Sequence, residues 1–196
     1  GAGLLTLGGG AITFSKGDGA TSSQTYTSTT IGASNSSSLG IYSISSNLLL
    51  NTGVITRTAQ TGGTVAFTLT SAPSSINNIN VGASALGNWA TFTDALNATN
   101  FATKDGSNNI IAVTTSAIDD VSMWASPTAN FTDSSGYTGT VSGTGAANAA
   151  SVRFSAAATS TITLGSGSIL NITGGSTSLP GGDLGDLRSG GQRRFH

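Results

Sequence analysis

Residues 4–14 are LLTLGGGAITF, and residues 161–173, far along the chain, are TITLGSGSILNIT. Both stretches consist of a short apolar strand, a glycine-rich turn and a second strand, with Leu before the turn and Ile after it. Recurrence of one strand–turn–strand unit is typical of a solenoid, in which each coil covers the apolar face of its neighbour and no coil is stable alone. The sequence therefore predicts stacked β-coils.

Further short segments with alternating or β-branched residues lie between these two stretches, and turn residues bound each of them. The predicted strands are 24–31, 39–43, 54–58, 64–70, 78–81, 109–113, 139–142 and 151–154. Many short strands predict an all-β fold, in the form of a right-handed parallel β-helix (β-solenoid). Turn signals every ~8–12 residues are also typical of an antiparallel β-sandwich, which is the alternative architecture.

Residues 116–136 interrupt this pattern. Their sequence, SAIDDVSMWASPTANFTDSSG, predicts an irregular excursion from the coil, either a loop or a short helical segment. The composition changes again after Pro180, where glycines accompany three of the seven basic residues and the only His. We therefore predict a β-solenoid domain over residues 1–180 and a flexible Gly/Arg tail over residues 181–196, either natural or introduced by cloning.

The chain of 196 residues is almost uncharged, with 7 Lys and Arg, 8 Asp, no Glu and a net charge of −1. Long amphipathic helices take their outer face from Glu, Lys, Arg and Gln, so this composition favours β-structure. The chain also lacks the positive electrostatic field that would attract nucleic acids or anionic membranes. We therefore expect neither as a partner. The absence of Cys excludes disulfides and thiolate metal sites.

No apolar run approaches the ~18 residues that a membrane-spanning helix needs, so no span is predicted. The chain opens at Gly1 without Met or a basic leader. We therefore expect either a mature chain or an excised fragment.

Three segments carry a resemblance to a known family. They are residues 53–69 (GVITRTAQTGGTVAFTL), 85–113 (ALGNWATFTDALNATNFATKDGSNNIIAV) and 150–173 (ASVRFSAAATSTITLGSGSILNIT). The ordered series of ITR, GG-x-V-x-F, WAT, FAT, VRF and TITL segments resembles the autotransporter-associated β-strand repeat proteins of bacterial surfaces. The resemblance covers most of residues 1–178.

This resemblance implies a segment of a secreted or surface-displayed passenger of a Gram-negative-type bacterium. A structural or adhesive role without catalysis or cofactor is then expected. Its partners would be surface glycans, matrix proteins and further repeats of a longer protein. One alternative is a carbohydrate-binding or polysaccharide-active β-helix module, and a second is a hydrolase that combines a Ser with His196.

Two aromatic triplets, Trp-Ala-Thr at 89–91 and Phe-Ala-Thr at 101–103, lie twelve residues apart. This spacing suits two successive strands, and Asp105-Gly106 supplies a hairpin-type turn signal after the second. Trp89 and Phe101 would then cover a coil as core or edge residues. Alternatively, these two rings and Trp124 would form a platform that stacks on a sugar.

Asp119 and Asp120 are the only adjacent carboxylates, and a glycosidase-type mechanism needs two that converge. Adjacent residues of a strand point to opposite faces, so such a pair would converge only in a loop. Asp105, Asp119 and Asp120 are also candidate calcium ligands, because calcium accepts oxygen donors from flexible loops. Turn formation is the competing explanation for all three.

Overall fold

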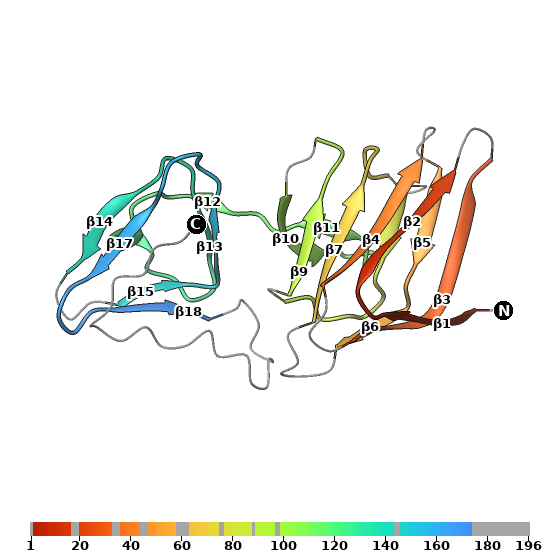
Figure 1. Ribbon diagram of the computed structural model, residues 1–196, viewed down its shortest axis with the longest axis horizontal. Coiled ribbons are helices and arrows are strands. Elements are labelled where there is room, and N and C mark those ends of the chain that lie inside the picture. The colour runs from red at the N-terminus through yellow and green to blue at the C-terminus, as the bar shows by residue number, and fades with distance from the viewer. Residues whose placement is uncertain are drawn as a thin grey trace. The chain divides into compact units, whose positions relative to one another are not determined.

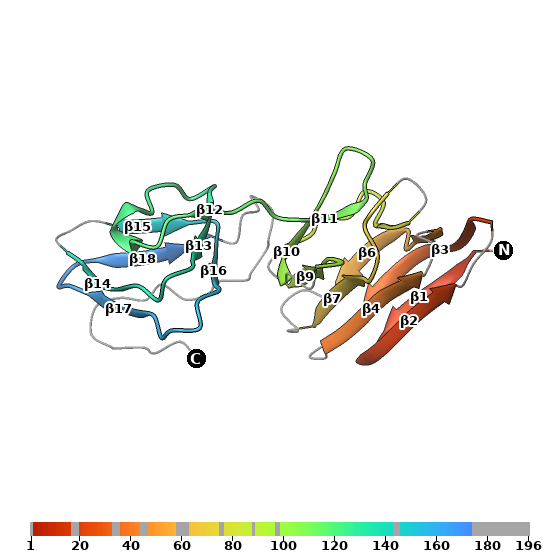
Figure 2. The same cartoon turned by 90° about the horizontal axis from the view of Figure 1, so that it is seen from above.

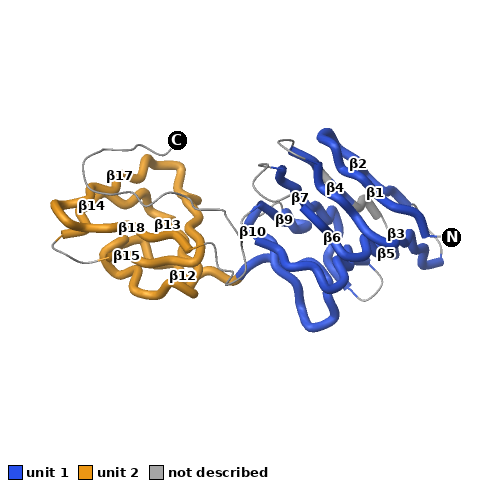
Figure 3. Tube along the Cα trace, turned by 90° about the horizontal axis from the view of Figure 1, so that it is seen from below, with its two compact units in different colours: residues 1–113 blue, residues 114–196 orange. Residues whose placement is uncertain are grey.

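The computed structural model describes residues 2–16, 20–32, 36–43, 47–57, 63–74, 77–87, 89–96, 99–142 and 146–173. Regular structure in this part of the chain consists of β-strands and one 3-10 turn, which confirms the all-β prediction. The chain divides into two compact units, unit 1 (Gly1–Val113) and unit 2 (Thr114–His196), coloured separately in Figure 3. The predicted tail over residues 181–196 lies outside the described residues.

The first nine described strands of unit 1 form three parallel sheets, two of which share one long strand, and the last two strands pair antiparallel; Figures 1 and 2 show the unit from two sides. The strands are β1 (Gly3–Leu7), β2 (Gly10–Lys16), β3 (Ser22–Ile31), β4 (Ser36–Ser43), β5 (Leu48–Asn51), β6 (Val54–Arg57), β7 (Thr64–Leu69), β8 (Asn78–Asn80), β9 (Ala90–Thr93), β10 (Thr99–Lys104) and β11 (Ile110–Ala112). The first sheet contains the start of β3 with β5 and β8. The second contains β1, the end of β3 and β6. The third contains β2, β4, β7 and β9.

Neighbouring strands within each sheet come from successive passes of the chain. Thr30 lies beside Thr56, 26 residues later, and Ser36 lies beside Thr64, 28 residues later. These parallel pairings confirm the β-solenoid. The antiparallel β-sandwich alternative is wrong, because a sandwich would join consecutive strands as antiparallel neighbours.

The glycine-rich turn at residues 8–10 is a corner of a coil. It joins β1 to β2, but β1 pairs with β3 and β2 pairs with β4, so the turn connects two different sheets. Gly9 and Gly10 have φ angles of 107° and 83°, a region that glycine adopts without strain. The predicted strand–turn–strand unit therefore exists as one corner of the solenoid.

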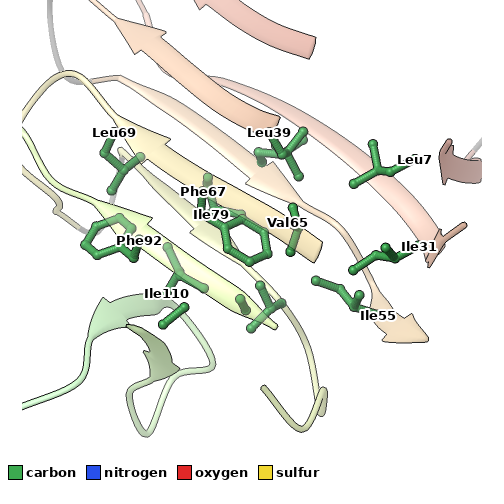
Figure 4. Close-up of a cluster of buried hydrophobic side chains, with 14 of the residues drawn as sticks. Leu7, Ile31, Leu39, Ile55, Val65, Phe67, Leu69, Ile79, Phe92 and Ile110 are labelled. Atoms are coloured by element: carbon green, nitrogen blue, oxygen red, sulfur yellow. The ribbon is translucent and has the colours of Figure 1, made fainter. Parts of the chain in front are cut away.

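Alternation along the strands directs apolar side chains into the core of unit 1. In β7, Val65, Phe67 and Leu69 are buried, and the residues between them face outward. Figure 4 shows that these side chains lie in one cluster with those of Leu39, Phe92 and Ile110, from β4, β9 and β11. Each coil thus covers the apolar face of the next.

Buried threonines bind carbonyl groups at the corner between the first and second sheets. Thr29 Oγ1 donates to Thr52 O at 2.8 Å, and Thr52 Oγ1 donates to Asn80 O at 3.1 Å. Both threonine side chains have no exposed surface. The buried hydroxyls therefore find acceptors in backbone carbonyls at the corner, as buried polar groups require.

Unit 1 ends differently near residue 113. β10 pairs antiparallel with β9, and β11 pairs antiparallel with β10. The turn between β10 and β11 contains the predicted Asp105-Gly106 signal, with Asp105 N donating to Asn109 O at 2.9 Å. The hairpin prediction for this turn is confirmed.

Unit 2 repeats the three-sheet arrangement with shorter strands. Its described elements are β12 (Ser116–Ala117), the 3-10 turn η1 (Val121–Met123), β13 (Asn130–Asp133), β14 (Thr138–Val141), β15 (Ala146–Ala149), β16 (Ser151–Phe154), β17 (Thr161–Leu164) and β18 (Ile169–Ile172). The sheets are β12-β13-β16, β14-β17 and β15-β18, all parallel. The predicted excursion at residues 116–136 contains irregular segments and η1, but also β12 and β13, which belong to the solenoid.

A test of the corner geometry is the variant Gly53→Ala. Gly53 has φ 64°, and a Cβ there would lie 2.2 Å from Thr27 O of the preceding coil. Left-handed strain and this clash with backbone should lower the free energy of unfolding by about 2 kcal/mol or more. Gly106→Ala is the control, because a Cβ at Gly106 meets nothing within 4 Å. Equal urea-unfolding midpoints for the two variants would contradict this account of the corner.

Candidate functional site

The two aromatic triplets lie on the last parallel strand of unit 1 and on the strand that pairs with it. Phe101 of β10 pairs with Thr91 of β9, and Trp89 immediately precedes β9. Trp89 is almost fully buried, and the Arg57 guanidinium carbon lies 5.9 Å from the centre of its ring. Phe101 is half-buried. These positions favour the interpretation in which the rings cover a coil.

Trp124 belongs to unit 2, whereas Trp89 and Phe101 belong to unit 1. Its side chain is 1% exposed, and its ring stacks on Phe131 with 5.6 Å between the ring centres. Its Nε1 donates to Ile118 O at 2.8 Å. The indole is therefore a core side chain with its polar atom satisfied, and burial leaves it no accessible face for a sugar.

Asp105 anchors the hairpin turn of unit 1. Its Oδ1 accepts hydrogen bonds from Ser107 N at 2.8 Å and from Asn109 N at 2.9 Å. These hydrogen bonds lower the pKa of the Asp105 carboxyl below its ordinary value, and the bond from Asn109 N has the largest effect. The same turn holds Lys104 Nζ, which donates to Asn108 Oδ1 at 2.9 Å and to Gly82 O at 3.1 Å.

Asp119 and Asp120 serve separate turns of unit 2. Asp120 caps η1 by accepting from Ser122 N at 2.9 Å, whereas Asp119 accepts from Ser134 N at 2.6 Å. Hydrogen bonds from Ser134 lower the pKa of the Asp119 carboxyl, and hydrogen bonds from Ser122 lower the pKa of the Asp120 carboxyl. Burial and the bond to Asp120 raise the pKa of the Tyr137 phenol. Turn formation thus accounts for both carboxylates.

Among the described residues, the most enclosed carboxylate is that of Asp133 at the end of β13, which has no exposed surface. Its Oδ1 accepts from Ser135 N and Gly136 N, and its Oδ2 accepts from Tyr137 N and Ser160 Oγ. Burial by itself raises the pKa of the carboxyl, but the bond from Ser160 and the three backbone bonds outweigh burial, and the pKa is lowered. Sequence analysis did not select this residue as a site. The sequence feature that could have indicated its role is an Asp followed directly by the turn residues Ser-Ser-Gly.

These carboxylates are suited to binding backbone N–H groups, and they are poorly suited to acid–base catalysis. A glycosidase-type pair needs one carboxyl that stays protonated, which requires a raised pKa. Asp105, Asp119, Asp120 and Asp133 all have lowered pKa values. Residues 174–196, which include His196 of the hydrolase hypothesis, lie outside the described part of the chain.

Within the described ranges, no group of three or more His, Cys, Asp or Glu side chains lies close enough to bind one metal ion. A helix long and apolar enough to span a membrane is also absent from these ranges.

Comparisons of the chain with protein-family models, curated proteins and solved structures gave no significant match. The fold therefore defines the class, an all-β solenoid protein. A more specific assignment depends on the chemistry of its surfaces.

We expect Asp133→Asn to destabilise unit 2 by about 2–3 kcal/mol, because the amide cannot accept all four hydrogen bonds and its own N–H groups would face donors. Asp120→Asn is the matched control, since Asn caps a helical turn as well as Asp and the side chain is exposed. Urea unfolding at neutral pH measures both. Equal losses in the two variants would contradict the anchoring role.

The contribution of Asp133 should also depend on pH. A carboxyl with a pKa below 3.8 in the folded state stabilises the fold above that pH. The contribution is then lost as the pH falls from 3.8 through the lowered value. The difference in stability between the parent chain and Asp133→Asn should therefore shrink between neutral and strongly acidic pH. A constant difference would contradict the assignment.

Calcium should leave stability unchanged if Asp105, Asp119 and Asp120 act as turn anchors. A site saturated a hundredfold above its dissociation constant would add roughly 2.7 kcal/mol. We expect the melting temperature in millimolar calcium and in excess chelator to agree within about 1 °C. A larger calcium-dependent rise that Asp119→Asn abolishes would establish a metal site instead.

Proposed function

We propose that this chain is a structural segment of a secreted or surface-displayed bacterial protein of the autotransporter passenger type. Two points support the proposal. The sequence resembles passenger repeats, and the fold is a β-solenoid whose described carboxylates anchor turns. The observation that carries it is the continuous stacking of coils in parallel register.

A stacked solenoid suits a rigid stalk for physical reasons. Each internal strand is paired on both sides, so its backbone donors and acceptors are occupied and a protease cannot bind it in extended form. Outward positions carry hydroxyls in ranks, as where Thr30 Oγ1 and Thr56 Oγ1 lie 3.3 Å apart. A face with hydroxyls and few charges would meet neutral glycans or matrix proteins without electrostatic selection.

The partners that the resemblance implies include further repeats of a longer protein. A coil of the same type would continue the ladder beyond an end strand, since every coil presents the same edge. The carbohydrate-active alternative receives less support, because Trp124 is buried and the carboxyls of the described turns have lowered pKa values.

Two measurements test the structural role together. Proteinase K digestion of the purified chain should leave the described strands intact, with cuts confined to connections between strands. Antibody or biotin labelling of intact cells that produce the native protein should reach it at the surface or in the medium. Rapid digestion of the strands, or labelling only after lysis, would contradict the proposal.

A glycan and matrix-protein panel tests the adhesive part. Binding through the exposed hydroxyl faces should be insensitive to salt and should survive Trp124→Phe, which keeps the core ring. Binding that salt abolishes would show that the scarce charges recognise the partner, contrary to this proposal.

A further inference from the structure

No described sheet contains strands from both units. The sheets with β1 to β11 include no strand of unit 2, and the sheets with β12 to β18 include no strand of unit 1. The two hydrophobic clusters are likewise separate, because one contains residues of unit 1 alone and the other contains residues of unit 2 alone. The hydrogen-bonded ladder that couples successive coils of a solenoid is therefore interrupted between β11 and β12.

The turn of the β10–β11 hairpin closes the first sheet of unit 1. β5 pairs with one edge of β8, and the hairpin turn occupies the other edge, where Asn80 and Asn109 form an antiparallel bridge. Val81 N donates to Asn108 O at 2.9 Å, and Asn80 Nδ2 donates to Ser107 O at 2.7 Å. The last strand of this sheet therefore has partners on both sides within unit 1.

A side chain closes the second sheet. β6 pairs with β3 on one edge, and on its other edge Ile55 N donates to Ser84 Oγ at 2.7 Å. A hydroxyl thus takes the position that a strand carbonyl would occupy. A turn fixes this hydroxyl, because Ser84 N donates to Val81 O at 3.2 Å and Ser84 Oγ also donates to Val81 O. Ser84 is 2% exposed, so its bond to Ile55 is shielded from water.

Apolar side chains that follow β8 cover the end of the core at the third sheet. Ala102 of β10 and Ile110 of β11 are buried in the same cluster as Phe92 of β9 (Figure 4). Leu86 and Ala112 pack against this cluster as partly buried residues. The segment with the two antiparallel strands therefore shields the apolar face that a further parallel coil would otherwise cover.

Lys104 ties the hairpin to the turn at residues 81–84. Its Nζ donates to Gly82 O at 3.1 Å and to Asn108 Oδ1 at 2.9 Å. Gly82 has φ 56°, and a Cβ there would lie 3.2 Å from Gly53 C, so the turn packs directly on the preceding corner. One ammonium group thus links the closure of the second sheet to the hairpin that closes the first and the third.

We propose that residues 81–113 form a cap that stops local unfolding from passing between the two units. In a solenoid each coil depends on its neighbours, so the loss of one coil exposes the next. The hydrogen bonds and apolar contacts of the cap named above all lie within unit 1, and they persist when unit 2 opens. The two units then open independently, and a stalk that loses one unit keeps the other. This inference concerns the folding of the chain and does not depend on its cellular location.

Native-state hydrogen exchange of the full chain tests the independence of the units. Asp133→Asn and Leu170→Ala each weaken unit 2, since Asp133 binds four donors and Leu170 belongs to the core. We expect amides of β13, β14 and β17 to exchange at least about tenfold faster in each variant, whereas those of β7 and β9 change less than about twofold. Unit 1 should stay protected even in a variant whose unit 2 is wholly unfolded. Acceleration of β7 and β9 by the same factor as unit 2 would overturn the proposal.

The cap itself is tested by Ser84→Ala, which removes the acceptor of Ile55 N. The Ile55 amide should exchange about tenfold faster, as the loss of one buried hydrogen bond predicts, and the amides of β13 and β17 should keep their rates. Ser107→Ala is the matched control, because Ser107 is exposed in the hairpin turn and the loss of its hydroxyl should leave Ile55 unchanged. An unchanged Ile55 rate in Ser84→Ala, or equal acceleration of β13, would overturn the proposal. Neither result would alter surface labelling of intact cells, which tests the structural role separately.

Discussion

Parallel registration between successive coils is the constraint on which the rest of this structure depends. The described strands have two to ten residues and are too short to be stable singly, so each gains stability from the strands with which it pairs. Registration also aligns side chains. Ile12, Leu39, Phe67 and Phe92 pair consecutively through four coils and form one apolar rank. A slip of one residue would turn that rank outward and place threonines in the core.

Corners decide whether this registration can be kept, because there the backbone leaves the sheets and its polar groups need other partners. Unit 1 uses threonine hydroxyls and glycines, as in the chain of bonds through Thr29, Thr52 and Asn80. Unit 2 uses a buried carboxylate, Asp133, which collects three backbone N–H groups and the hydroxyl of Ser160. A carboxylate offers more lone pairs than a hydroxyl, and these four bonds offset the cost of removing its charge from water.

The alternation in β7 and the glycines between β1 and β2 made the solenoid predictable from the sequence. Other strands lacked a comparable signal. β5 is LLLN, a continuous apolar run, and β15 is AANA, whose alanines have low strand propensity, so both depend on pairing with neighbouring coils. β13 lies within a segment rich in turn residues. In each case distant strands supply the stabilisation that local sequence does not show.

The candidate site shows the same limit. The position of Asp105 in a turn follows from the Asp-Gly pair, but the enclosure of Asp133 depends on Ser160, 27 residues further along the chain. The role of Trp124 likewise depends on Phe131, which stacks on it from β13. Residue type alone suggested a sugar platform, and only the fold shows which faces of the rings are covered.

Charge is scarce in this chain, and two of its charged residues lie together at the end of unit 1. Lys104 and Asp105 both lie in the hairpin that follows β9, where Lys104 Nζ binds Gly82 O of the preceding corner and Asp105 fixes the turn. The hairpin thereby ends the run of parallel strands in its sheet with two antiparallel strands. These two charges thus lie where pairing changes from parallel to antiparallel, and they fix the turn and the corner at which that change occurs.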